Sequence, residues 1–287
     1  MRIGAVLPQT EIGPDASAIR AYGQGVEQLG FSHLAVYDHV VGADPQVHEN
    51  WNGPYDIDTQ FHEPFVLFGY LAACTSLELL TSIVILPQRQ TVLVAKQAAE
   101  VDLLTAGRLR VGVGIGWNPV EYEALGEDFS LRGSRVEEQV ELLRRLWTER
   151  SVTFKGRFDT VTGAGLAPLP IQRPIPIWFG GMSERALERM GRLADGWLPL
   201  VQPGPKLDAA LQTIGRAALS AGRDPASIEM QGRVDWRGDE QDLVERAQAW
   251  REAGATHLAV NTMGAGLSGV DAHLDALAST ARLLELA

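Results

Sequence analysis

The sequence is poor in cysteine: Cys74 is the only one among 287 residues, and it lies in an apolar run. A disulfide framework is therefore excluded, and a buried, unreactive thiol is the better interpretation. No histidines are spaced as paired metal ligands, and no His-Glu-x-x-His motif occurs, so we expect no metal site. The sequence also lacks the Gly-x-Ser-x-Gly motif of a nucleophile elbow.

Positive charge is also scarce. The chain has 25 Lys and Arg against 36 Asp and Glu, for a net charge of −11. Such a field repels nucleic acid and anionic membranes, so neither is expected as a partner. No apolar run approaches the roughly 20 residues of a membrane span, and the apolar stretch 1–8 is too short for a signal sequence. We expect a cytoplasmic protein that acts on a small-molecule substrate.

What the sequence does contain is a repeated alternation of short apolar runs and amphipathic segments. The predicted strands are 3–7, 34–37, 80–86, 109–113, 177–179, 196–200, 228–234 and 257–261, each followed by a predicted helix. Eight such units predict an α/β protein with a (β/α)8 TIM barrel, formed by a single domain over 1–287. The alternative is a doubly wound open sheet. It is disfavoured because Trp117 stands where the dinucleotide motif needs its third glycine.

Three segments depart from this alternation. Residues 41–63 form a long connection whose aromatic residues and histidines favour a lid or pocket wall over disorder. Residues 152–154 and 157–158 predict a small surface hairpin around Lys155-Gly156. Residues 167–176 are rich in proline, and we interpret them as a stiff insert because the alternation resumes after them. A long helix is predicted for 64–77.

The stretch 108–119 runs from an apolar strand through three alternating glycines to Trp117 and a helix start at Pro119. Glycines here can let a ligand approach the backbone, or they can simply relieve crowding where a strand leaves a barrel. The stretch alone does not separate these two interpretations.

In a barrel the carboxyl ends of the strands gather around one mouth, where ligands bind. The residues predicted there are Asp38, His39, Ser82, Ile83, Gly112 to Trp117 (including Gly114 and Gly116), Gly180, Gly181, Met182, Ser183, Trp197, Arg233 and Asn261. Small and polar residues with tryptophans at the edge suit a flat aromatic cofactor that carries a phosphate. The backbone N–H groups of 180–183 and the Ser183 hydroxyl are candidates to hold that phosphate, and Ser183 can cap the next helix as well.

His39 is the candidate for proton transfer, because its imidazole titrates near neutral pH and it ends a barrel strand. Asp38 beside it could tune the local charge. Lys96, Arg185 and Arg189 could serve an anionic ligand tail or could simply face solvent, and Arg89 follows a strand end and is better placed.

Several of these segments together resemble the bacterial luciferase-like flavin and deazaflavin oxidoreductases. The matching motifs include Tyr-Asp-His at 37–39, Thr-Ser-Ile-Val-Ile-Leu-Pro at 81–87, 107–117 with its glycines, Trp-Phe-Gly-Gly at 178–181 and Ala-Asp-Gly-Trp at 194–197. The resemblance covers nearly the whole chain, and in combination these motifs are specific.

The resemblance implies a usually dimeric barrel with a flavin or deazaflavin ring at the strand ends. It also implies a cis peptide between Ser82 and Ile83, which would support that ring. Within the family the chain is most similar to enzymes that use coenzyme F420, which implies hydride transfer with His39 in the proton role. Two other functions stay open: an FMN-dependent monooxygenase, which usually needs a reductase partner, and a non-catalytic flavin-binding barrel.

One position departs from the family pattern. In the deazaflavin sugar-phosphate dehydrogenases of this family, a catalytic glutamate follows the glycines where Trp117 stands here. That substrate class is therefore in doubt, and the sequence names no substrate.

Overall fold

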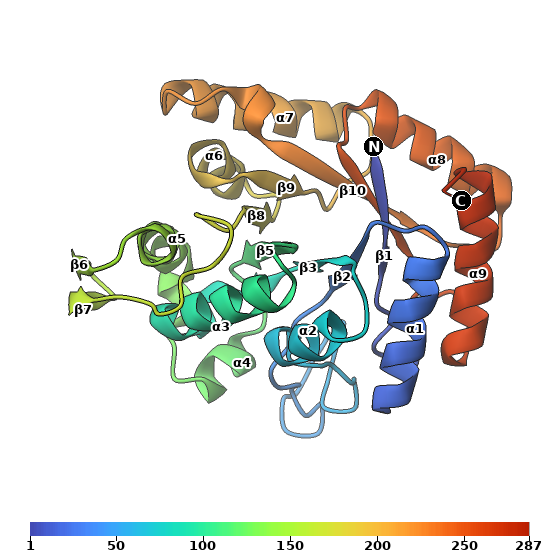
Figure 1. Cartoon of the computed structure of the whole chain (residues 1–287), viewed down its shortest axis with the longest axis horizontal. Coiled ribbons are helices and arrows are strands. Elements are labelled where there is room, and N and C mark those ends of the chain that lie inside the picture. Colours follow the sequence, from blue (N-terminus) through green and yellow to red (C-terminus); the bar gives the residue numbers. More distant parts are fainter. Residues whose placement is uncertain (287) are drawn as a thin grey trace.

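The computed structural model describes residues 1–286, which form a closed parallel barrel surrounded by helices (Figure 1). Pairing runs β3-β2-β1-β11-β10-β9-β8-β5, and β3 closes onto β5. The strands are β1 (Arg2–Val6), β2 (His33–Val36), β3 (Glu78–Thr81), β4 (Val84–Ile85), β5 (Leu109–Gly114), β8 (Ile177–Gly180), β9 (Gly196–Leu198), β10 (Glu229–Asp235) and β11 (His257–Asn261). This arrangement confirms the predicted (β/α)8 barrel, because the alternating elements wind in one direction and bury the sheet on both faces.

The long helices follow the strands in turn. They are α1 (Ala16–Gln28), α2 (Pro64–Ala72), α3 (Thr91–Leu104), α5 (Arg132–Thr148), α6 (Glu184–Leu193), α7 (Pro205–Ser220), α8 (Glu240–Glu252) and α9 (Gly269–Leu283), and a short α4 (Pro119–Ala124) precedes α5. Side-chain caps fix several starts: Asp15, Glu63, Asn118 and Ser183 each accept a backbone N–H of the first turn.

The third barrel strand is not continuous, which corrects the prediction of one strand over 80–86. It consists of β3 and β4, and the peptide between Ser82 and Ile83 that separates them is cis, as the resemblance implied. After β4 the chain turns into a short 3-10 helix, Leu86–Gln88. The apolar character of the run did not show this interruption, because both pieces are buried like one strand.

Two other predicted boundaries were wrong. The helix predicted for 64–77 ends at Ala72, and the chain turns before β3. The second strand of the hairpin is β7 (Thr160–Ala164), paired with β6 (Val152–Lys155), rather than 157–158. The turn between them is longer because the Glu138 carboxylate, on α5, accepts the backbone N–H groups of 157, 158 and 159.

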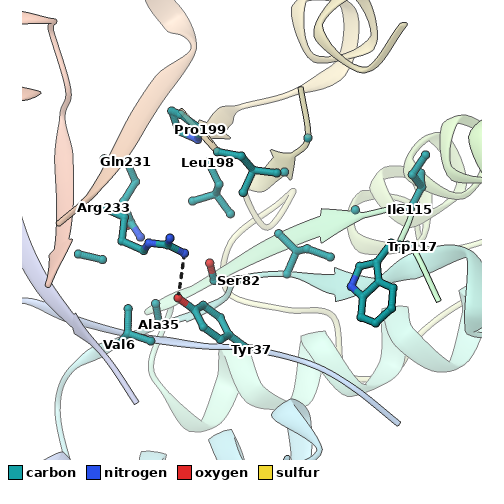
Figure 2. A pocket seen from close by; sticks show the side chains of 18 residues that line it. Val6, Ala35, Tyr37, Ser82, Ile115, Trp117, Leu198, Pro199, Gln231 and Arg233 are labelled. Atoms are coloured by element: carbon teal, nitrogen blue, oxygen red, sulfur yellow. Dashed lines mark hydrogen bonds between the residues drawn. The ribbon is translucent and has the colours of Figure 1, made fainter. Parts of the chain in front are cut away.

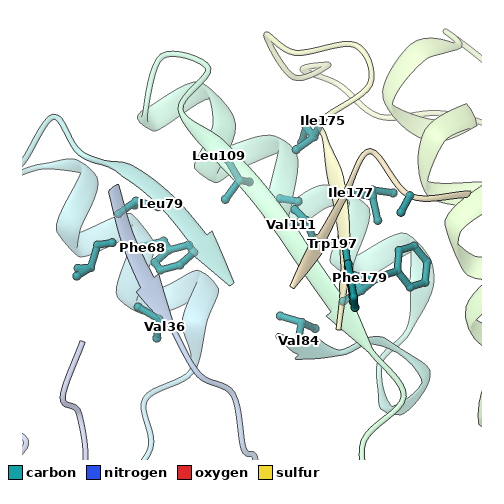
Figure 3. Close-up of a cluster of buried hydrophobic side chains, with 14 of the residues drawn as sticks. Val36, Phe68, Leu79, Val84, Leu109, Val111, Ile175, Ile177, Phe179 and Trp197 are labelled. Atoms are coloured by element: carbon teal, nitrogen blue, oxygen red, sulfur yellow. The ribbon is translucent and has the colours of Figure 1, made fainter. Parts of the chain in front are cut away.

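The main apolar core lies between the strands and the helices, and Figure 3 shows part of it around Val111 of β5 and Ile177 of β8. A second, smaller cluster fills the inside of the barrel around Trp178 and Leu80. The barrel is therefore packed through its interior by side chains, and a cavity opens where the strands end.

Polar side chains occupy the barrel interior at the amino ends of the strands. His33 and His257, the first residues of β2 and β11, have ring centroids 5.7 Å apart. The guanidinium of Arg110 lies 4.6 Å from the Trp178 ring and pairs with Glu78. These charged and polar groups are buried at the end of the barrel opposite the strand termini that were predicted to bind a ligand.

Candidate functional site

The carboxyl ends of the strands enclose a cavity of about 300 Å³, called the mouth cavity here (Figure 2). Its walls come from seven of the barrel strands and from the peptide between β3 and β4. The lining residues are Val6, Ala35, Tyr37, Ser82, Ile83, Gly114, Ile115, Gly116, Trp117, Gly180, Gly181, Leu198, Pro199, Leu200, Gln231, Gly232, Arg233 and Ala259. The lining is mostly apolar, which suits the faces of a flat ring.

Ile83 explains the glycines that precede Trp117. A Cβ on Gly114 would lie 2.6 Å from Ile83 Cδ1, and a Cβ on Gly180 would lie 3.1 Å from Ile83 Cγ2. Gly116 has a φ of +66°, and a Cβ there would lie 2.7 Å from Ile85 Cγ2. The glycines thus make room for the interrupted third strand, and because they line the mouth cavity they also leave its wall without side chains.

The segment 180–183 lies between the mouth cavity and the start of α6. Gly180 and Gly181 line the cavity, while Met182 and Ser183 do not. The Ser183 hydroxyl accepts the N–H of Ala186 at 3.3 Å and so caps α6. The Trp197 indole N–H donates to the Gly181 carbonyl at 3.4 Å, so Trp197 supports this segment from the core without lining the mouth.

Arg233 is the one charged side chain among the lining residues of the mouth cavity. It donates to the Tyr37 hydroxyl at 3.3 Å and pairs with Asp235 at 3.2 Å. Burial raises the pKa of Tyr37, and the positive charge of Arg233 opposes that rise only in part. Figure 2 shows Tyr37 and Arg233 on one side of the cavity and Trp117 on the other, so one rim is polar and the opposite rim is aromatic.

His39 lies just outside the mouth cavity and is paired with a buried carboxylate. Its Nδ1 is 3.5 Å from Oε2 of Glu121, which is fully buried at the start of α4. Glu121 also accepts the backbone N–H of Val40 at 2.5 Å and the side-chain amide of Gln88 at 3.1 Å. Burial alone would raise the pKa of Glu121, but the hydrogen bonds from His39, Val40 and Gln88 lower it below its ordinary value.

The loop 41–63 covers His39 and forms a second cavity of about 430 Å³, called the side cavity here. The imidazole packs against the rings of Tyr55 and Phe61, at centroid distances of 4.9 and 4.8 Å. The lining residues of the side cavity are His39, Val40, Val41, Gly42, Tyr55, Asp56, Ile57, Thr59, Gln60, Phe61 and Asn118. Because residues of this loop line a cavity, the pocket-wall interpretation of 41–63 is confirmed.

Trp117 stands between the two cavities. It lines the mouth cavity, and its ring lies 5.7 Å from the imidazole of His39 and 5.7 Å from the ring of Trp51 in the loop. The residue that breaks the dinucleotide motif therefore separates His39 from the mouth. His39 faces the side cavity.

Asp38, predicted beside His39 as a cofactor residue, is buried below the mouth rather than lining it. It pairs with Arg89 at 2.9 Å and accepts the N–H of Ile85 at 3.3 Å, and Arg89 also pairs with Glu63 at 2.8 Å. Burial raises the pKa of Asp38, with Arg89 opposing the shift. This network connects β4 to the start of α2. Its two carboxylates neutralise Arg89, the arginine that was a candidate to bind an anionic ligand.

Glu121 was not among the residues predicted for the site. Its position four residues after Trp117, in the first turn of a helix that follows a barrel strand, could have identified it. Asn261, predicted at the mouth, ends β11 but does not line the mouth cavity, and its side-chain amide donates to Asp235 at 2.9 Å.

Across residues 1–286, no group of three or more His, Cys, Asp or Glu side chains is arranged to hold a metal ion. Among the same residues, no helix has both the length and the apolar character needed to cross a membrane.

Related proteins are similar in sequence to part of this chain. A protein of Mycobacterium tuberculosis without an assigned function is 37% identical over 164 residues, which cover 57% of this chain and 56% of that protein. An FMNH2-dependent dimethylsulfone monooxygenase of Pseudomonas putida is 34% identical over 146 residues, which cover 50% of this chain and 40% of that one. The matched segments thus span about half the length of these relatives.

Solved structures share the whole fold. An F420-dependent secondary alcohol dehydrogenase, solved with an F420-acetone adduct, superposes with a TM-score of 0.77 at 21% identity, covering 97% of this chain and 98% of that one. The monooxygenase RslO1 from Streptomyces bottropensis superposes with a TM-score of 0.74 at 20% identity, covering 99% of both chains. The model of the luciferase-like monooxygenase family matches residues 1–280, and the chain therefore belongs to that family of flavin- and F420-dependent oxidoreductases and monooxygenases.

Proposed function

We propose that this chain is an F420-dependent oxidoreductase that transfers a hydride between a deazaflavin in the mouth cavity and a small organic substrate. The cofactor would supply the hydride chemistry, and the protein would position both reactants, exclude water and handle the proton. His39 is the residue assigned to the proton.

The residues of the mouth cavity fit such a ring. The Ile83 side chain packs against Gly114 and Gly180, and together they form an apolar wall of the mouth cavity. Arg233 provides hydrogen-bond donors at one rim, where a ring with polar edge atoms needs them, and the buried Gln231 adds a polar side chain deeper in the cavity. Ser82, Gly116, Trp117 and Gly181 complete the proposed contacts with the ring, and Met182 and Ser183 remain the proposed contacts with its phosphate.

The observation that carries the proposal is the pairing of His39 with Glu121 beside the mouth cavity. Glu121 engages Nδ1 of the imidazole, and this leaves Nε2 as the atom for proton exchange. Oxidation of an alcohol, or reduction of a carbonyl, needs one proton moved together with each hydride. A carboxylate-oriented histidine meets that need, although the glutamate expected at position 117 is absent.

The side cavity is the proposed place for the substrate, since His39 lies in its wall. A substrate in the side cavity must pass Trp117 to reach the cofactor ring in the mouth cavity. We therefore propose that Trp117 controls the access of substrate to the cofactor.

A second candidate function is an FMN-dependent monooxygenase. The relative from Pseudomonas putida favours it, because its name states that it uses FMNH2, and the apolar mouth suits either ring. In that case a separate flavin reductase would be a partner. A non-catalytic flavin-binding barrel is the third candidate, and a homodimer is proposed for all three.

The test compares two assays on one purified sample. In the first, oxygen is excluded: oxidised F420 is added to secondary alcohols, chemically reduced F420 is added to ketones and aldehydes, and deazaflavin absorbance is followed. In the second, FMN, a flavin reductase, NADH as the electron donor and oxygen are added to the same panel. Turnover only in the first assay is expected. Turnover only in the second would transfer the proposal to the monooxygenase, and cofactor binding without turnover in either would favour the non-catalytic barrel.

A further inference from the structure

Next to the mouth cavity lies a third cavity of about 700 Å³, between α5 and α6, which we call the arginine groove. Four arginines and two glutamates line it, so its charge is positive although the whole chain carries −11. The lining residues are Ile115, Ser130, Arg132, Gly133, Ser134, Glu137, Ser183, Arg185, Glu188, Arg189 and Arg192. A local positive field in an acidic protein selects anionic ligands.

Two of the four arginines already have a carboxylate partner within the protein. Arg189 and Arg192 both pair with Glu137, each at 3.0 Å, and Arg189 also donates to the Gly133 carbonyl at 3.1 Å. These contacts join α6 to α5. Arg189 and Arg192 therefore hold together the two helices that form the arginine groove.

The other two arginines have no carboxylate partner within residues 1–286. Arg185 is exposed in the first turn of α6. Arg132 lies over the Phe129 ring at 3.7 Å and donates to the Phe129 carbonyl at 2.5 Å, which fixes its guanidinium without neutralising it. Two uncompensated charges thus remain available to a ligand.

The arginine groove adjoins the mouth cavity. Ile115 lines both, and Ser183 in the groove is only two residues after Gly181 in the mouth. A ligand with its ring in the mouth and a phosphate near 180–183 would therefore extend into the groove.

We propose that the arginine groove binds an oligocarboxylate tail attached to the cofactor in the mouth, through Arg185 and Arg132. The inference rests on the proposed function, because a deazaflavin cofactor carries glutamates beyond its phosphate and FMN ends at its phosphate. Lys96, considered at first for such a tail, pairs with Glu100 at 3.3 Å on α3 and lines neither cavity.

The test measures how much the glutamates contribute to binding. Fluorescence anisotropy of the deazaflavin gives Kd for F420 and for the same molecule with its glutamates removed, which keeps the ring and the phosphate. We expect the native protein to bind F420 at least about fivefold more tightly than the molecule without glutamates. This preference should disappear in high salt. The double variant Arg185→Glu, Arg132→Gln should abolish the preference and leave the affinity for the shortened molecule within about twofold.

The matched control is Arg251→Glu, a charge reversal at an exposed arginine on α8, which should change neither affinity. Equal binding of both molecules by the native protein, or equal weakening of both in the double variant, would overturn the groove assignment while leaving the proposed function intact. If the native protein binds neither molecule, both the proposed function and the groove assignment are wrong. Thermal unfolding of each variant checks that the fold is retained.

Discussion

The two ends of strand β2 carry histidines in opposite surroundings. His33 begins the strand inside the barrel, and His39 lies three residues beyond its last residue, at the carboxyl end. The first is buried near a cation, Arg110, and the second faces a carboxylate, Glu121, and a cavity. One strand thus presents the same side chain to two different environments.

At the amino end the histidines are held neutral. Burial, followed by the charge of Arg110, lowers the pKa of His33 well below its ordinary value. Burial, Arg110 and Arg2 lower the pKa of His257 to about 3. Neither imidazole lines the mouth cavity or the side cavity, so neither is positioned to exchange a proton with a ligand.

The difference shows that residue type alone does not mark a functional histidine. Proton transfer to a ligand needs a cavity that reaches the imidazole and a partner that orients it, and His39 has both. The amino-end histidines instead make the stability of the fold depend on pH, which makes the two ends separable by experiment.

The largest expected effect is on turnover in His39→Ala. Removal of a general acid or base lowers turnover by about 100-fold or more, so the variant should lose at least that much against a substrate found in the panel. The affinity for F420 and the unfolding temperature should change little, because His39 does not line the mouth cavity. A variant that keeps more than about a tenth of native turnover would remove His39 from the proton role.

Arg110→Leu should affect stability rather than chemistry. The substitution removes the ion pair with Glu78 and the contact with Trp178, inside the barrel. Losing one member of a buried pair costs about 3 kcal/mol, measurable by urea unfolding. Arg251→Leu at the surface should cost less than about 0.5 kcal/mol. If Arg110→Leu costs no more than that control, the amino-end cluster is not a source of stability.

The stability of the protein should also fall in acid because of His257. The pKa of His257 is about 3 in the folded protein, against an ordinary value of 6.5 that applies to the unfolded chain. As the pH falls, the unfolded chain therefore binds the proton first. The stabilisation is complete above pH 6.5 and is lost as the pH falls toward 3, by about 2 kcal/mol between pH 7.5 and pH 5. His257→Gln should reduce the pH dependence of urea unfolding by that amount. An unchanged pH dependence would mean that His257 does not stay neutral in the fold.

The smallest effect is expected for Glu121→Gln. The amide keeps the size of the side chain and can still contact His39, but it carries no negative charge. Turnover should fall by about tenfold, and the pH profile of turnover should shift, because the charge beside the imidazole has changed. A change in turnover with an unaltered pH profile would mean that Glu121 acts only through packing.

The alternation of apolar runs and amphipathic segments was sufficient to predict the barrel. Each buried strand needs a helix to cover it, and the strand–helix order repeats along the chain. The break at Ser82-Ile83 was not visible in that pattern, and it was implied only by resemblance. The hairpin boundaries were wrong because Glu138, nineteen residues before Arg157, determines the turn between β6 and β7. Such long-range contacts leave no local signal.

The site was predictable to the extent that it follows from strand ends. Ser82, Ile83, Gly114 of β5 and Gly180 of β8 line the mouth because the barrel strands end there, whereas Gly112, two residues earlier in β5, does not line it. The pairing of Glu121 with His39 was not predictable, since it depends on the direction in which α4 leaves β5. The position of Trp117 between two cavities likewise depends on how loop 41–63 packs.

The most direct test of the central claim is a competition between F420 and FMN for the same purified protein. Equal concentrations of the two cofactors are mixed with the protein, and the bound fraction is separated and identified by its absorbance spectrum. The account predicts that bound F420 predominates and that His39→Ala does not change this result. A bound fraction composed of FMN would contradict it.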